Sequence, residues 1–178
     1  MQKELPKRKI IRLQEYDYSS KGCYFITICS QQRMNLFGEI PVGQGLCPCR
    51  LSNIGEIINH EIKQLSPRFP NITIDKYVIM PNHVHLLMII QNVSQEQEIE
   101  RQGQSPCPTP TIGDVIGALK SISTKKANER DDTRGRKVWQ FRYHDHVIRD
   151  EEDYRQIWQY IDENPAKWTI DRYYWEDS

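Results

Sequence analysis

The chain contains 178 residues with 24 basic and 24 acidic side chains, so its formal net charge is zero. This length suits one domain, and we expect residues 1–178 to form a single domain whose core runs from about residue 22 to about residue 168. A net charge of zero by itself argues against a nucleic-acid partner. The sequence shows neither a signal peptide nor a run of roughly 20 apolar residues, which predicts a cytoplasmic protein without a membrane partner.

The first half of the chain begins with a predicted strand and a predicted helix. Residues 22–30 alternate in polarity and are rich in β-branched and aromatic side chains, which is typical of a strand. Residues 51–69 place apolar side chains at helical spacing, with Ser52 or Asn53 as the possible N-cap and Pro67 near the end. We therefore expect a strand followed by a helix.

Two apolar runs then follow each other closely, over residues 72–80 and 83–90. They read as strands, because each is short and rich in β-branched residues. Pro81 and Asn82 between them favour a tight turn. The pattern predicts a β-hairpin.

The last third of the chain predicts two more helices. Residues 111–130 carry apolar side chains at helical spacing after Thr111, a good N-cap. Residues 137–149 are mixed and aromatic, which favours a strand or an extended loop. Residues 150–164 open with carboxylates, which stabilise a helix start, and this helix must end near Asn164 because Pro165 disfavours helical geometry before it.

This order of elements predicts an α+β fold, a ferredoxin-like antiparallel sheet with helices packed on one side. Residues 42–50 and 101–110 interrupt the order, share Gln-Gly and Cys-Pro sequences, and are expected to be loop insertions. They contain three of the five cysteines. An odd number of cysteines in a chain without an export signal argues against a disulfide framework, and the Cys-Pro-Cys spacing is not that of a zinc knuckle.

Basic residues gather in two segments despite the zero net charge. Residues 1–13 carry five basic side chains against Glu4, and residues 120–142 carry eight against three acidic ones. A local basic surface can attract phosphates, because salt limits the reach of each charge to about 10 Å. The alternative is a solvated helix face, which composition does not exclude.

Two histidines, His83 and His85, stand one residue apart in the second strand of the hairpin. Side chains two apart in a strand point to one face, with Cα atoms about 6.5 to 7 Å apart, so both imidazoles could bind one metal ion. The alternative is a pair of hydrogen-bonded sheet histidines. A histidine-triad nucleotide hydrolase would need a third histidine two residues further on, where this chain has Leu87.

A second pair, His144 and His146, has the same spacing in a more polar setting. We interpret His146 as structural or substrate-contacting, and the role of His144 stays open.

The final helix places Tyr160 and Asn164 four residues apart on one face. Two imidazoles and an amide oxygen would form an incomplete shell for Mg²⁺ or Mn²⁺, and an activated tyrosine is an oxygen nucleophile, which together outline a phosphoryl-transfer site.

The sequence resembles a known family in two motifs. PNHVHLLM at residues 81–88 resembles the His-hydrophobic-His motif of the HUH single-tyrosine transposases. VWQFRYHDHVIRDEEDYRQIWQYIDENPAKW at residues 138–168 is similar to the region of the REP-associated tyrosine transposases that ends in a tyrosine-bearing helix and Asn-Pro. The resemblance extends from about residue 22 to residue 168.

The resemblance implies that His83, His85 and Asn164 bind Mg²⁺ or Mn²⁺ and that Tyr160 is the nucleophile. It implies a transposase that cleaves and rejoins hairpin-forming single-stranded DNA of palindromic repeats, through a covalent 5′-phosphotyrosine intermediate, as a nucleoid-associated monomer or homodimer. The residues expected to contact DNA are Arg8, Lys120, Lys125, Lys126, Arg130, Trp139, Arg142, Tyr143 and His146. The alternatives are a domesticated hairpin-binding module that no longer cleaves and a metal-dependent phosphoesterase.

Overall fold

The computed structural model describes residues 21–40, 49–91 and 110–174. The predicted basic arm with Arg8 and most of the two predicted insertions lie outside these residues. Within the described ranges, no helix has the length and apolar character needed to cross a membrane.

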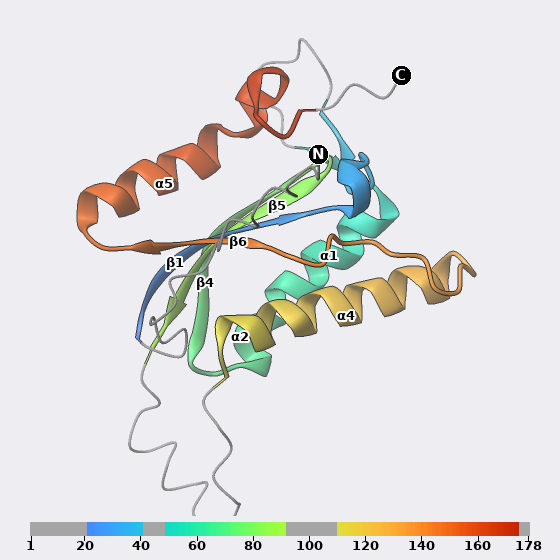
Figure 1. Cartoon of the computed structure of the whole chain (residues 1–178), viewed down its shortest axis with the longest axis horizontal. Helices are drawn as coiled ribbons and strands as arrows, with labels where there is room; N and C mark the ends of the chain where they lie inside the picture. Colours follow the sequence, from blue (N-terminus) through green and yellow to red (C-terminus); the bar gives the residue numbers. More distant parts are fainter. Residues whose placement is uncertain (1–20, 41–48, 92–109, 175–178) are drawn as a thin grey trace, which may run out of the picture.

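The molecule is built on a four-stranded antiparallel sheet, in the order β4-β5-β1-β6 (Figure 1). Its strands are β1 (Gly22–Cys29), β4 (Ile72–Met80), β5 (His83–Ile90) and β6 (His144–Ile148). A separate two-stranded sheet pairs β2 (Gly38–Glu39) with β3 (Arg50–Leu51). The predicted strand and hairpin are therefore confirmed, whereas only the second half of the predicted extended segment 137–149 forms a strand.

The helices are α1 (Asn53–Lys63), α2 (Leu65–Arg68), α4 (Ile112–Arg130) and α5 (Glu151–Glu163), with short 3₁₀ turns η1 (Gln31–Arg33) and η2 (Pro165–Ile170). Each predicted cap is present. The Ser52 hydroxyl accepts from the Gly55 amide, and Thr111 and Asp114 form a capping box at the start of α4. Helix α5 ends at Glu163, directly before Asn164 and Pro165, as predicted.

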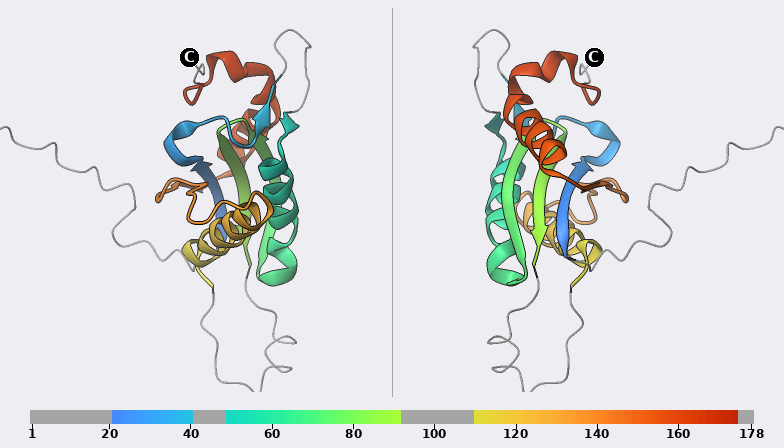
Figure 2. Two further views of the ribbon diagram at one scale, coloured as in Figure 1. Left: turned by 90° about the vertical axis from the view of Figure 1, so that its right-hand side faces the viewer. Right: turned by 90° about the vertical axis from the view of Figure 1, so that its left-hand side faces the viewer.

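The helices lie on both faces of the sheet (Figures 1 and 2). Helices α1 and α4 pack against each other and cover one face, where alternate residues of β1 and β5 form the core. Helix α5 crosses the other face and packs on β4 and β5. The predicted α+β class with an antiparallel sheet is confirmed, but the prediction that the helices pack on one side is wrong, because α5 folds back onto the opposite face. That face carries His83 and His85, because strand side chains alternate.

A buried carboxylate joins the helices below the sheet. The side chain of Glu61 is fully buried and accepts hydrogen bonds from Lys126 (2.5 Å) and Arg68 (3.1 Å). Burial alone would raise the pKa of Glu61, but these two bonds outweigh it and hold that pKa below its ordinary value of 4.5. Lys126, one of the predicted DNA contacts, thus forms an ion pair that links α4 to α1.

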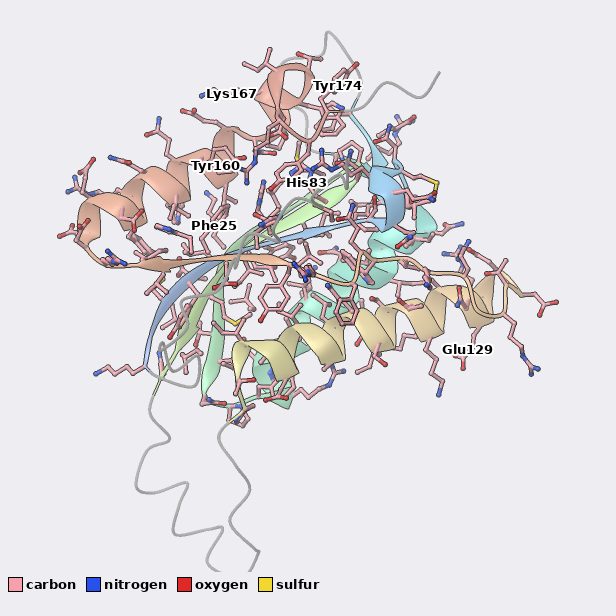
Figure 3. The ribbon with its side chains drawn as sticks, viewed as in Figure 1. Phe25, His83, Glu129, Tyr160, Lys167 and Tyr174 are labelled. Atoms are coloured by element: carbon pink, nitrogen blue, oxygen red, sulfur yellow. The ribbon has the colours of Figure 1, made fainter. Side chains whose placement is uncertain are left out.

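Replacing Glu61 with glutamine is expected to lower the free energy of unfolding by about 3 kcal/mol at pH 7, because two cations lose their anionic partner. A carboxylate whose pKa is lowered by folding stabilises the protein above its unfolded-state pKa and loses this effect as the pH falls. The difference between wild type and variant in urea unfolding should therefore shrink below about pH 4.5. Glu129→Gln, on the exposed part of α4 with Lys125 3.8 Å away, is the control and should change the free energy little (Figure 3). An equal difference at pH 7 and pH 3 would contradict the prediction.

Candidate active site

The two histidines of β5 are fully buried under α5 with their rings directed at each other. Their Nε2 atoms are 3.0 Å apart. In the sheet, His83 pairs with Cys29 and His85 with Thr27, both on β1. The strand therefore does what the spacing predicts and directs both imidazoles to one point. Figure 3 shows His83 below Tyr160 of α5.

The outer nitrogen of each ring has its own partner. His83 Nδ1 lies 2.9 Å from Asn82 Oδ1, and His85 Nδ1 lies 2.9 Å from Thr27 Oγ1. The Asn82 amide nitrogen donates to two carbonyls, so its oxygen must accept, and His83 carries its proton on Nδ1. His83 Nε2 thus offers a lone pair, which is the state that binds a metal.

His85 can supply a second lone pair after a change of tautomer. In the network as it stands, His85 Nε2 donates to His83 Nε2, and the Thr27 hydroxyl donates to His85 Nδ1. If the His85 proton moves to Nδ1, the same Thr27 hydroxyl accepts it, and both Nε2 atoms become free ligands. Burial lowers the pKa of both histidines, that of His83 to about 4, so both rings are neutral near pH 7.

Helix α5 brings Tyr160 and Asn164 to this pair. The Tyr160 oxygen is 3.4 Å from His85 Nε2, and Phe25 of β1 packs against both rings. Asn164 is almost fully buried, yet its side-chain oxygen has no hydrogen-bond partner among the described residues. A buried oxygen without a partner is costly, and a bound cation would satisfy it.

Asp171 joins the site, although no motif in the sequence points to it. The 3₁₀ turn η2 turns the chain back after Pro165, so that an Asp171 oxygen and one nitrogen of each histidine lie within 4.8 Å of one another. The same carboxylate accepts from the Tyr160 hydroxyl (3.4 Å) and the Asn164 amide (3.3 Å). Nothing in the sequence signals this position, because an aspartate after an irregular turn has no periodic pattern.

Polar contacts hold α5 on the sheet. The Tyr154 hydroxyl donates to Asp75 (2.6 Å), and Lys76 binds Asp162 (2.6 Å) while its Nζ lies 2.9 Å from the centre of the Trp158 ring. These contacts come from β4, the strand beside the histidine strand. They fix the position of the tyrosine helix on the sheet of its own chain.

The two tyrosines of α5 differ in position and not in acidity. Burial, and to a smaller extent the charge of Asp171, raises the pKa of Tyr160 to about 12. The pKa of Tyr154 is also raised to about 12, chiefly because the Tyr154 hydroxyl is hydrogen-bonded to Asp75. Tyr160 faces the histidines, and Tyr154 faces Asp75. A nucleophilic Tyr160 would therefore need activation by the groups around it.

Several predicted DNA contacts have other roles in the structure. Trp139 is buried, donates to Ser123 and packs on Phe37, so the prediction that it stacks on bases is wrong. Lys120 donates to the carbonyls of residues 140, 141 and 142 at 2.9 to 3.2 Å. Burial lowers the pKa of Lys120 to about 8, and its ammonium group braces this loop.

The remaining predicted contacts lie at or near the surface. Tyr143 is partly buried against the core, and His146 pairs with Asp153 at the start of α5 (2.8 Å). His144 lies beside Thr27 in the sheet, so both β6 histidines share the face of His85, although the metal-ligand group among the described residues does not include them. Lys125, Arg130 and Arg142 are exposed without a described role in the fold, whereas the exposed His146 and Lys126 are held by Asp153 and Glu61.

Comparison with known proteins identifies relatives. No family model matches the sequence. A Haemophilus influenzae protein that is itself uncharacterised is 36% identical over 173 residues, which cover 94% of this chain and 93% of the relative. A second Haemophilus influenzae protein, provisionally named a REP-associated tyrosine transposase, is 25% identical over 159 residues, 85% of this chain and 74% of the relative.

A solved structure shares the fold. It is a REP-associated tyrosine transposase bound to a REP hairpin, which matches with a TM-score of 0.52 and 21% identity over 88% of this chain and 74% of that one. The sheet and its covering helices thus have the architecture of a tyrosine transposase. The fold and the sequence of this chain are thus similar to those of REP-associated tyrosine transposases, the group that its two motifs resemble.

Proposed function

We propose that this protein is a metal-dependent single-strand endonuclease and strand transferase that acts on hairpin-forming DNA through a 5′-phosphotyrosine intermediate. The observation that carries the proposal is the distance of 3.4 Å between the Tyr160 oxygen and His85 Nε2. A potential nucleophile adjoins a potential metal site, which is the arrangement that tyrosine-mediated phosphoryl transfer requires.

The residues present fit a divalent cation. Two neutral imidazoles, the partnerless oxygen of Asn164 and the Asp171 carboxylate form a mixed nitrogen and oxygen set that suits Mg²⁺ or Mn²⁺. In this proposal His83, His85 and Asn164 hold the metal, with Asp171 beside them. A bound cation would polarise the phosphoryl oxygen of the substrate.

The chain's own residues account for the proton and the new bond. The Tyr160 oxygen attacks phosphorus and forms the phosphotyrosine ester, while its proton passes to the Asp171 carboxylate 3.4 Å away. The bond to the 3′ oxygen breaks, and that oxygen takes a proton from a water molecule, whose hydroxide is neutralised by the proton that Asp171 accepted. The ester keeps the energy of the phosphodiester, so a 3′ hydroxyl can attack it in the reverse direction to join strands.

The relative of known structure was bound to a REP hairpin, and we propose the same class of substrate for this chain. The exposed basic side chains Lys125, Arg130 and Arg142 are the candidates for phosphate contacts. His83, His85, Tyr160, Asn164 and Asp171 all come from one chain, so the proposed chemistry does not need a second copy. Such an enzyme would act at the nucleoid.

Incubation of the protein with Mn²⁺ and a labelled DNA hairpin with single-stranded flanks is expected to give an adduct that survives denaturing electrophoresis. The adduct should disappear when EDTA removes the metal, because the histidine pair then lacks its cation. Salt-sensitive binding without an adduct under any metal would instead indicate a domesticated, non-cleaving module. Hydrolysis of small phosphoesters without DNA would indicate a phosphoesterase.

A further inference from the structure

Two arginines from distant parts of the chain meet at the edge of the candidate site. The guanidinium carbon of Arg33 lies 5.3 Å from the centre of the Tyr173 ring, and that of Arg172 lies 4.6 Å from it. Tyr173 is buried, and its ring centre is 4.7 Å from that of His83. One aromatic ring thus separates both cations from a proposed metal ligand.

Asn82 fixes these groups in one place. Its amide nitrogen donates to the backbone carbonyls of Arg33 (3.1 Å) and Tyr173 (2.7 Å), while its oxygen is 2.9 Å from His83 Nδ1. The residue that orients His83 therefore also positions the segment of Arg33 and the segment of Arg172. A fixed spacing between cations and metal ligands is what recognition of one anion requires.

Neither arginine forms an ion pair within the described part of the chain, although Arg172 donates to the neutral Tyr173 hydroxyl (2.6 Å). Both side chains are exposed, and none of the ion pairs among the described residues involves Arg33 or Arg172. A divalent cation at the histidines would add further positive charge nearby. An anion that bridges this region would relieve the repulsion between these cations.

The backbone is strained at the first arginine and at the residue before it. Gln32 (φ 56°) and Arg33 (φ 59°) both have left-handed backbone geometry, which non-glycine residues seldom adopt. Such strain is maintained where surrounding contacts demand it, often at functional sites. Here the contact is the bond from Asn82 to the Arg33 carbonyl.

We propose that Arg33 and Arg172 form a phosphate-binding rim that holds one backbone phosphate of single-stranded DNA beside His83 and His85. The inference rests on the proposed function for its DNA substrate. A guanidinium group matches a phosphate through two parallel hydrogen bonds, and the Tyr173 ring orients both arginines, since each guanidinium lies over this ring and Arg172 Nη2 also donates to the Tyr173 hydroxyl (2.6 Å). Contacts of this kind position the strand without reading its sequence.

The test measures binding in a Tyr160→Phe background, so that no cleavage interferes. The probe is a fluorescent DNA hairpin with a single-stranded flank, made as a series in which one phosphate at a time is a neutral methylphosphonate. Arg33→Ala and Arg172→Ala should each weaken binding of the unmodified probe roughly 10-fold. For the probe with a methylphosphonate at one particular position, the arginine variants should cause no further loss of affinity, because the phosphate charge that Arg33 and Arg172 contact is already absent.

The proposal would be overturned if, at every position of the series, the loss of affinity caused by the arginine variant simply multiplied the loss caused by the methylphosphonate. Arg155→Ala, which removes an exposed arginine paired with Glu151 and Glu152 on α5, is the control and should leave binding unchanged. Arg33→Lys and Arg172→Lys keep the charge and lose the planar fork, so their affinity for the probe should lie between that of wild type and that of the alanine variants. Thermal unfolding checks that all variants are folded. If the protein with Tyr160 formed no covalent adduct, the proposed cleavage would be contradicted, but the binding result for the two arginines would still stand.

Discussion

Tyr160→Phe is expected to abolish the covalent protein–DNA adduct, with a loss of at least about 10³-fold in the rate of its formation. Phenylalanine has no oxygen to form the ester, and it is the Tyr160 oxygen that lies 3.4 Å from His85 Nε2. The measurement is denaturing electrophoresis of labelled hairpin DNA after incubation with Mn²⁺.

The same substitution should leave the fold intact. The contacts of the Tyr160 hydroxyl with His85 and Asp171 are long, at 3.4 Å each, and the residue is 37% exposed. The edge contact of its ring with Phe25 does not involve the hydroxyl and would persist. The free energy of unfolding should therefore change by less than about 1 kcal/mol, so loss of the adduct would not reflect unfolding.

Tyr154→Phe provides the matched control on the same helix. The pKa of Tyr154 is also raised to about 12, but its hydroxyl donates to Asp75 and not to the histidines. The adduct should form in this variant. An adduct that persists in Tyr160→Phe and disappears in Tyr154→Phe would transfer the nucleophile to Tyr154 and contradict the proposed site.

The sequence predicted the local elements well because their signals are local. The strand at residues 22–30, the hairpin and the capped helix after Thr111 all follow from periodicity, turn residues and capping side chains within a few positions. The alternation of β5 likewise brought His83 and His85 to one face. These features need no knowledge of the tertiary structure.

The residues that the sequence assigned wrongly or missed depend on tertiary packing. Trp139 lies in an irregular segment, where no periodicity separates a buried ring from an exposed one. Lys120 follows a regular helix pattern, but the loop at residues 140–142 that it braces is distant in the sequence. Asp171 reaches the site only because η2 turns the chain back over the sheet.

Asn82 combines both kinds of information. Its place between two strands predicted only a turn residue, and the structure adds a buried side chain that links β5 to two other segments. Both of its amide hydrogens and its oxygen are used. Its side chain therefore tolerates no exchange of donors for acceptors.

Asn82→Asp is expected to lower the free energy of unfolding by about 3 kcal/mol or more. The carboxylate has the shape of the amide but cannot donate, so the carbonyls of Arg33 and Tyr173 lose their partner and face a buried negative charge. The proton on His83 Nδ1 would partly satisfy the new charge, which would raise the pKa of His83 and disfavour the neutral ring that a metal needs. Urea unfolding followed by circular dichroism measures the loss of stability, and Mn²⁺ titration measures the loss of affinity.

Asn59→Asp separates the loss of a donor from the change of charge. The Asn59 oxygen accepts from the Tyr77 hydroxyl at 2.7 Å, and a carboxylate can accept the same bond at this partly exposed position. This variant should stay within about 1 kcal/mol of wild type and bind Mn²⁺ normally. Equal stability of the two variants would mean that the bonds from Asn82 do not hold the site together. A large loss in Asn82→Asp alone would establish that the turn between the hairpin strands organises both the histidines and the arginine rim.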